Sequence, residues 1–277
     1  MAKDVAVVFV HGMGETEDDF DEAIKNRMYR RLGGPRYDRV YWDKAYYQGL
    51  LQENQRELFD VLQQGGDLDW TRLRKFLLFG FGDAAASIYR PEGKESIYFL
   101  TQKIIFETLS RVADALSSLN RPVIIVAQSL GGKVLSNYIW GAQQNQATWG
   151  IFGPDSDVQI PDGDLGRVIR LKTLRYLYTT GCNIPIFVSG MPLPKIKPFK
   201  VSSGGWDIHW ENYYDADDAL GWPLKPINAA YQKAVKVEKS INVGGVRAFW
   251  NPLSHMHYWR DDDFLDPLED RIRSILV

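Results

Sequence analysis

The chain has 277 residues, of which 45% are hydrophobic and 25% are charged, and its formal net charge is −2. This composition is that of an ordinary globular protein, and the charge gives no electrostatic reason to expect a nucleic-acid partner. The single cysteine excludes an internal disulfide, and no apolar run approaches the roughly 18 residues that cross a bilayer. Because the opening residues also lack the pattern of a signal peptide, we expect a cytoplasmic protein without a transmembrane segment.

The first apolar run, Val5–Val10, is short and ends at the loop His11-Gly-Met-Gly14. It predicts a buried central strand of a parallel sheet. Glycines in the loop would let a backbone N–H approach a reacting oxygen, as an oxyanion hole requires. A dinucleotide-binding loop is disfavoured because Glu17 stands where its third glycine is needed. We interpret His11, which directly ends the strand, as a structural residue.

Helices and strands alternate over the next hundred residues. Thr16 is the expected N-cap of a helix that ends before Gly33-Gly34-Pro35, and further patterns predict a strand over 39–42 and helices over 48–64 and 96–119. Between these two helices, residues 68–93 are crowded with aromatic side chains. This segment is interpreted either as a helix packed on the core or as an insertion that covers an apolar acyl pocket as a lid.

The most informative stretch begins after Pro122. A buried apolar strand runs to Ala127, a tight turn follows at Gln128-Ser129-Leu130, and a helix is expected from Leu130 to Gln143. A serine at such a turn sits in a strained backbone conformation, with its hydroxyl above the positive end of the helix. Ser129 is therefore a candidate nucleophile, and the alternative is that it is an incidental residue of the turn. A phosphate-binding loop is disfavoured, since two of its required residue types are missing.

Two later strands lead to acidic residues. The pattern predicts strands over 174–180 and 206–214, and the second runs into Asp215, Asp217 and Asp218. Carboxylates just beyond a strand lie at the edge where α/β folds bind their ligands. The spacing does not fit a calcium-binding EF-hand loop, because the required glycine and glutamate are absent.

Two histidines follow the last predicted strands, 235–243 and 247–250. His255 and His257 lie in the loop that precedes a final helix over 264–277. A His-x-His pair could bind a metal, but no second pair of ligands accompanies it, so we expect neither a metal nor another cofactor. Cys182 is interpreted as a small packed residue, because nothing nearby in the sequence would activate a thiol.

A serine, acids and a histidine thus occur in this order, each after a strand. In this the sequence resembles the α/β-hydrolase superfamily, including its serine esterases and lipases, and it resembles no closer named protein. The matching segments span nearly the whole chain, and they are Val8–Gly14, Ala127–Gly131, Asp217–Leu220 and Ser254–His255. The resemblance implies an α/β fold in one domain over 1–277, with a mostly parallel central sheet flanked by helices. It also implies a helical, lid-like insertion around residues 66–95.

The resemblance further implies a serine hydrolase that cleaves a carboxylic ester or thioester through an acyl-enzyme intermediate. Ser129 would attack the carbonyl, His255 would take its proton, and Asp218 would orient the histidine. Backbone N–H groups of Met13 and Leu130 would hold the oxyanion.

Several alternatives stay open. Asp217 or Asp215 could supply the acid, and His257 could replace His255. The substrate is expected to be a small-molecule acyl compound, and the aromatic segment favours a medium or long apolar acyl chain over a charged substrate. A different class of function, a non-catalytic binding or scaffold protein with the hydrolase fold, is also consistent with these residues.

Overall fold

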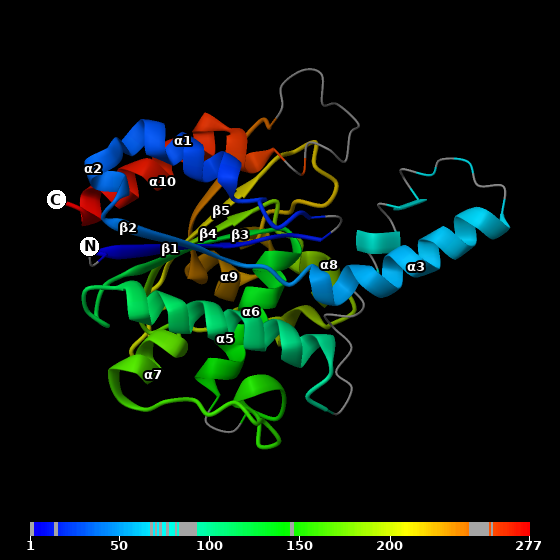
Figure 1. Ribbon diagram of the computed structural model, residues 1–277, viewed down its shortest axis with the longest axis horizontal. Helices are drawn as coiled ribbons and strands as arrows, with labels where there is room; N and C mark the ends of the chain where they lie inside the picture. Colours follow the sequence, from blue (N-terminus) through cyan, green and yellow to red (C-terminus); the bar gives the residue numbers. More distant parts are fainter. Residues whose placement is uncertain are drawn as a thin grey trace.

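The centre of the molecule is a parallel β-sheet, shown in Figure 1 as it appears in a computed structural model of the chain. The structure describes residues 3–13, 16–66, 69, 71, 74–75, 78–80, 82, 93–144, 147–243, 255 and 257–277. Within these ranges six strands lie in the order β2-β1-β3-β4-β5-β6, and every neighbouring pair is parallel. The strands are β1 (Val5–Val10), β2 (Val40–Ala45), β3 (Val123–Gln128), β4 (Leu174–Thr180), β5 (His209–Tyr214) and β6 (Val235–Ser240). The predicted fold class, a mostly parallel sheet flanked by helices, is confirmed.

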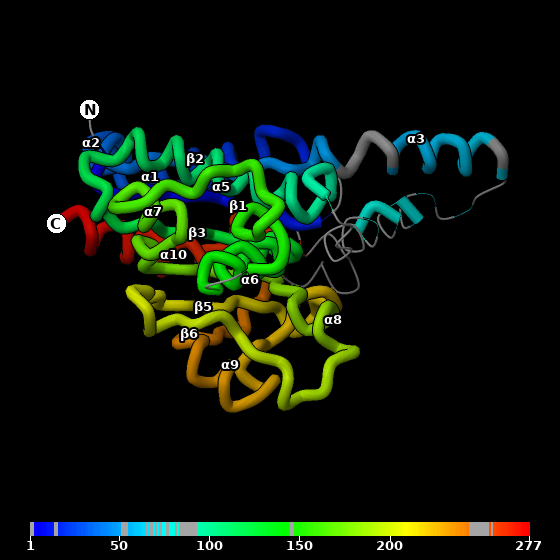
Figure 2. The backbone as a smooth tube through the Cα atoms, turned by 90° about the horizontal axis from the view of Figure 1, so that it is seen from below, coloured from blue at the N-terminus to red at the C-terminus, as the bar shows by residue number. Residues whose placement is uncertain are grey.

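Helices cover both faces of this sheet (Figure 1). One face carries α1 (Glu22–Leu32), α2 (Gly34–Tyr37) and α10 (Asp262–Ile275). The other face carries α5 (Ile97–Ala115), α6 (Leu130–Gln143) and α7 (Gly163–Ile169). Shorter helices within connecting segments are α8 (Ile184–Val188), α9 (Ala229–Ala234), η1 (Gly150–Phe152), η2 (Leu193–Lys195), η3 (Lys225–Ile227) and η6 (Tyr258–Arg260). The remaining long helix, α3 (Gly49–Gly65), extends away from the sheet in both Figure 1 and Figure 2.

The strand sequences explain why both faces are covered. Along β1, successive side chains point to opposite faces, and all six residues are buried. Val5, Val7 and Phe9 join the core cluster under α1 and α10, whereas Ala6 and Val8 join the cluster under α5 and α6. A continuous apolar run is therefore what a parallel strand buried on both sides requires.

The strand order reverses between β1 and β3. The chain moves from β1 outward to β2 and then returns to β3 on the other side of β1, with the connecting helices on opposite faces. The loops that follow β1 and β3 therefore diverge, which leaves a crevice at the carboxyl ends of these strands. Val10 lies opposite Ala127 in the register, so the loops starting at His11 and at Ser129 begin side by side.

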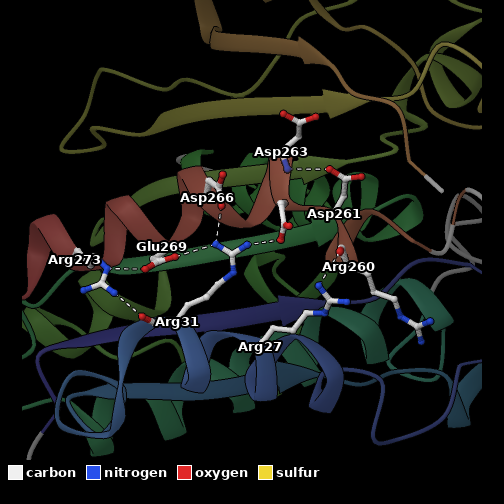
Figure 3. A network of polar contacts seen from close by, with 9 residues as sticks. Arg27, Arg31, Arg260, Asp261, Asp263, Asp266, Glu269 and Arg273 are labelled. Atoms are coloured by element: carbon white, nitrogen blue, oxygen red, sulfur yellow. Dashed lines mark hydrogen bonds and ion pairs between the residues drawn. The ribbon is translucent and has the colours of Figure 1, made fainter. Parts of the chain in front are cut away.

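Ion pairs fasten the C-terminal helix α10 to α1, as Figure 3 shows. Arg31 of α1 pairs with Asp262, Asp266 at 2.6 Å and Glu269 at 3.0 Å. Arg273 pairs with Glu269 at 2.7 Å and donates to the carbonyl of Arg31 at 2.5 Å. Since α10 directly follows η6, these contacts also hold η6 in place.

The first helix starts later in the chain than the sequence predicts. The helix expected to start after Thr16 begins only at Glu22, and Asp21 occupies the N-cap position. The reason is that Lys44 pairs with Asp18 at 3.1 Å and with Asp21 at 3.3 Å, which holds the preceding residues as a separate turn on β2.

The strand predicted over 247–250 and most of the segment 66–95 lie outside the described residues. In the described part of that segment, Phe79 is buried against Phe59, with ring centroids 6.2 Å apart. A single domain with a lid-like insertion therefore stays a prediction. Among the described helices, we find none that is both long and apolar enough to span a membrane.

Candidate active site

The site is built around the turn between β3 and α6. Ser129 has φ of 52° and ψ of −121°, a conformation that costs a non-glycine residue roughly 1–3 kcal/mol. The turn is held because the Ser129 N–H donates to the carbonyl of Thr180 on β4 at 2.9 Å. Gly131 is required here: a Cβ atom at this position would lie 2.5 Å from the carbonyl oxygen of His11 and 2.6 Å from that of Val10. Strand β1 and helix α6 can thus approach closely enough to place Ser129 beside the first loop.

The loop after β1 packs directly on this serine. A Cβ atom at Gly12 would come within 2.8 Å of the Ser129 Cβ. His11 supports the loop from behind, since its Nε2 accepts the Tyr47 N–H at 3.1 Å and its Nδ1 lies 2.8 Å from the Gly12 carbonyl. Burial lowers the pKa of His11 to about 4, although the hydrogen bond to Gly12 opposes the shift. His11 is therefore neutral, with its proton on Nδ1, in agreement with a structural role.

The two predicted oxyanion donors come from these same two elements. Leu130 is the first residue of α6, and the first N–H groups of a helix have no partner within the helix. Met13 is buried in the loop after β1 and lines the same pocket as Ser129. Gly80, from the aromatic segment, packs on the Met13 side chain: a Cβ atom there would lie 2.9 Å from the Met13 sulfur.

The acid and the histidine meet beyond β5 and β6. Asp218 Oδ2 lies 2.6 Å from His255 Nδ1, and both side chains are buried. Asp218 Oδ2 also accepts the Tyr258 hydroxyl at 2.8 Å, and its Oδ1 accepts the Leu220 N–H at 2.9 Å. Burial by itself would raise the pKa of Asp218, but these hydrogen bonds and the nearby His255 outweigh it and lower the pKa below its ordinary value. Asp218 is thus held as a carboxylate.

The alternative acids have other surroundings. Asp215 accepts the N–H of Asp217 at 2.9 Å and that of Val243 at 2.7 Å, so it fastens the turn. Asp217 is exposed. Of these three acids, the structure gives Asp218 alone a contact with His255.

The serine and the histidine line one pocket but are not hydrogen-bonded to each other. His255 Nε2 is buried and has no hydrogen-bond partner among the described residues. Ser129 Oγ instead accepts from Asn183 Nδ2 at 3.3 Å. The structure therefore brings Asp218 into contact with His255. It places Ser129 in the lining of the same pocket, but without a hydrogen bond between Ser129 and His255.

Three contributors were not found from the sequence. Gln128 donates from Nε2 to the backbone carbonyl of His255 and so ties the histidine loop to the serine turn. Tyr258 bridges the acid turn, because its hydroxyl donates to Asp218 and accepts the Asp215 N–H at 2.9 Å. Asn183 contacts Ser129 from the segment after β4. Only Gln128 carried a sequence signal, its position next to the serine.

The pocket beside these residues has a volume of about 240 Å³, and both apolar and polar residues line it. Its lining comprises His11, Gly12, Met13, Thr16, Glu17, Phe20, Ala23, Ile24, Gln128, Ser129, His255, His257, Trp259 and Arg260. In the part of the chain that the structure describes, no group of three or more His, Cys, Asp or Glu residues could hold a metal. Burial raises the pKa of Cys182 to about 12, which keeps this neighbouring thiol protonated and unreactive.

Comparisons with known proteins gave matches among solved structures alone: no family model and no curated protein matches the chain. A candidate hydrolase of the alpha/beta superfamily from Xanthomonas campestris pv. campestris is 12% identical, with 96% of this chain and 98% of that chain covered and a TM-score of 0.40. A lipase/esterase from Lactobacillus plantarum is 11% identical, with 100% of this chain and 88% of that chain covered and a TM-score of 0.46. The function is therefore inferred from the geometry of the site itself.

Proposed function

We propose that the chain is a serine hydrolase of the α/β-hydrolase type that cleaves a carboxylic ester or thioester. One observation carries the proposal: a buried Asp218–His255 pair, 2.6 Å apart, shares a pocket with a serine in a strained strand-to-helix turn. A folded protein has little reason to maintain a strained serine, an ionised acid and a histidine with an unpaired nitrogen in one place unless they act together.

The first half of the reaction is acylation. His255 Nδ1–H donates to the Asp218 carboxylate, which leaves the lone pair of Nε2 available to accept a proton. Once Ser129 Oγ and His255 Nε2 come within hydrogen-bond reach, the hydroxyl proton passes to His255 while Oγ attacks the carbonyl carbon. The carbonyl oxygen becomes an oxyanion that the N–H groups of Met13 and Leu130 hold. His255 then gives its proton to the leaving alcohol or thiol as the bond to it breaks.

The second half is hydrolysis of the acyl-enzyme. His255 takes a proton from water while the water oxygen attacks the acyl carbon, and it returns this proton to Ser129 Oγ as the acid is released. Throughout, Asp218 stays ionised and stabilises the imidazolium, since its pKa lies below the ordinary value.

The pocket suggests the substrate class. Met13, Phe20, Ile24 and Trp259 supply apolar walls, which suit the acyl part of a small-molecule substrate. Its volume of about 240 Å³ favours a compact acyl group. We therefore expect esters of short or medium acyl chains to react faster than those of long chains.

One observation favours a second candidate function. Because the contact between Ser129 and His255 is not closed, the same fold could serve as a binding or scaffold protein without catalysis.

Labelling with a fluorophosphonate separates the two functions. The wild type should gain the mass of one probe and lose hydrolysis of p-nitrophenyl esters, whereas Ser129→Ala should gain none and hydrolyse them at a rate at least ~10³-fold lower. Ser203→Ala, which alters an exposed serine distant from the turn, is the matched control and should label like the wild type. A folded wild type that neither gains mass nor cleaves p-nitrophenyl esters of any acyl length would refute the hydrolase proposal and support the scaffold function.

A further inference from the structure

A buried asparagine contacts the candidate nucleophile. Asn183 follows β4, is 0% exposed and directly precedes helix α8. Asparagine at this position usually caps the helix with its side-chain oxygen, but Asn183 makes no such bond. Its Nδ2 instead lies 3.3 Å from Ser129 Oγ, and its Oδ1 is buried without a hydrogen-bond partner among the described residues.

Hydrogen bonds to neighbouring segments hold the backbone around Asn183, and they therefore also hold its side chain near Ser129. The Gly181 N–H donates to the Tyr213 carbonyl at 2.9 Å, and the Cys182 carbonyl accepts the Trp222 N–H at 3.0 Å. Cys182 also packs on α6, since a Cβ atom at Gly132 would lie 3.0 Å from its sulfur. The segment is therefore held against both β5 and α6, the helix that directly follows Ser129.

The unpaired Oδ1 argues against a purely structural role. Leaving a buried acceptor without a partner is unfavourable, and an apolar residue of the same shape would avoid this cost. The contact of its N–H group with Ser129 is the feature of this amide that an apolar residue could not reproduce.

We propose that Asn183 is a further catalytic residue, which donates a hydrogen bond to Ser129 Oγ as this oxygen loses its proton. A hydroxyl has one donor and two acceptor sites. The amide occupies one acceptor site, which leaves the O–H for Nε2 of His255 and the second lone pair for the carbonyl carbon. As the proton moves to His255, negative charge develops on Oγ and the bond from Asn183 strengthens. The inference rests on the proposed function.

The test compares two replacements by their rates of fluorophosphonate labelling from pH 5 to pH 9. Asn183→Leu removes the donor without adding charge, so it should label about 10-fold more slowly at every pH. Asn183→Asp has nearly the same shape but gains a carboxyl, whose pKa burial would raise toward neutrality. When protonated it can still donate to Oγ, and when ionised it repels the developing charge. The ratio of wild-type to Asn183→Asp rates should therefore rise at least ~10-fold from pH 5 to pH 9.

A matched control is Asn212→Asp, which places the same new carboxyl at another fully buried asparagine, on β5. Asn212 bonds to Thr179, Trp222 and Glu238 and not to the serine, so its rate ratio should not change with pH. Thermal unfolding verifies that each variant is folded, and Asn183→Leu carries the test alone if Asn183→Asp does not fold.

The outcomes are distinct. Labelling of both Asn183 variants at the wild-type rate would overturn the role of Asn183 and leave the hydrolase proposal intact. No labelling of the folded wild type would overturn both. A pH-dependent ratio for Asn183→Asp, together with a constant one for Asn212→Asp, would support the donor.

Discussion

Three neighbouring carboxylates in one turn differ because of the atoms that surround each of them. Asp215 accepts two backbone N–H groups and fastens the turn, Asp217 is exposed, and Asp218 faces His255. The hydroxyl of Tyr258 joins the first and the last, since it accepts from the Asp215 backbone and donates to Asp218. Residue type alone therefore does not assign the acid, but the hydrogen bonds do.

This difference predicts opposite results for two similar substitutions. Asp218→Asn should lower the rate of ester hydrolysis by about 10³–10⁴-fold, because an amide can neither stabilise the imidazolium nor fix the tautomer of His255. Asp217→Asn removes an exposed carboxylate and should change the rate less than about twofold. Steady-state hydrolysis of a p-nitrophenyl ester measures both. A large loss in Asp217→Asn with none in Asp218→Asn would show that the acid is misassigned.

Sequence reasoning could find candidates for this site but not its supporting contacts. Ser129, Asp218 and His255 each stand at the end of a predicted strand, and the order of the three is informative. The contacts of Asn183 with Ser129 and of Tyr258 with Asp218 join residues 54 and 40 positions apart. No local pattern encodes such pairs, because they depend on how the segments after different strands pack together.

Among the elements, helix α6 starts at a position that the neighbouring backbone constrains closely. Its second residue, Gly131, lies where a Cβ atom would meet two backbone carbonyls of the β1 segment at 2.5 and 2.6 Å. Backbone atoms within a sheet cannot move away as a flexible side chain can. The glycine therefore couples the position of the serine turn to the central strand.

Gly131→Ala should consequently destabilise the protein by about 1–3 kcal/mol, as overpacking of a core does. It should also slow labelling of Ser129, because α6 must shift to relieve the clash. Gly49→Ala is the matched control: it lies at the start of α3, where a Cβ atom would meet nothing within 4 Å, and alanine favours a helix. Urea unfolding gives both free energies, and equal stability of the two variants would contradict the close approach.

Element boundaries could be predicted where local sequence defines them, but not where tertiary contacts do. The ranges expected for β4 and α6 agree with the structure, because burial and local turn residues define them. The predicted start of α1 was wrong, because ion pairs from Lys44 on β2 hold Asp18 and Asp21 in a separate turn. A cap residue such as Thr16 is a local signal, and a tertiary ion pair can override it.

At the scale of the whole molecule, the parallel sheet explains why distant segments share one site. The segments that begin at His11, Ser129, Gly181 and Asp215 all follow carboxyl ends of neighbouring strands. Reversal of the strand order between β1 and β3 opens the crevice at this edge. The fold class could therefore be predicted from buried apolar runs, while the depth and lining of the pocket required the packed side chains.

The same arrangement makes the stability of the whole molecule sensitive to acid through His11. Burial lowers the pKa of His11 to about 4 in the folded protein, against an ordinary value of 6.5 that applies when the chain is unfolded. Between these two values the unfolded chain binds a proton that the folded chain does not bind, so acidification favours unfolding. The free energy of unfolding should thus fall by about 3 kcal/mol from pH 6.5 to pH 4 on account of His11.

Asp218 acts in a separate, lower window. Its folded pKa lies below the ordinary value of 3.8, so its contribution is complete above that pH and is lost as the pH falls further. Asp218 therefore contributes little to the change in stability between pH 6.5 and pH 4, the window in which His11 acts.

Urea unfolding across this range, on the wild type and on His11→Gln, tests the assignment. Glutamine does not titrate, so the variant should be less stable than the wild type at pH 7, where it lacks the ring contacts with Tyr47, yet should lose less stability on acidification. His257→Gln is the matched control, because it removes a partly exposed histidine that lines the same pocket, and it should retain the wild-type slope. If His11→Gln retained the full slope, the acid sensitivity would have to arise from groups other than the histidine under the first loop.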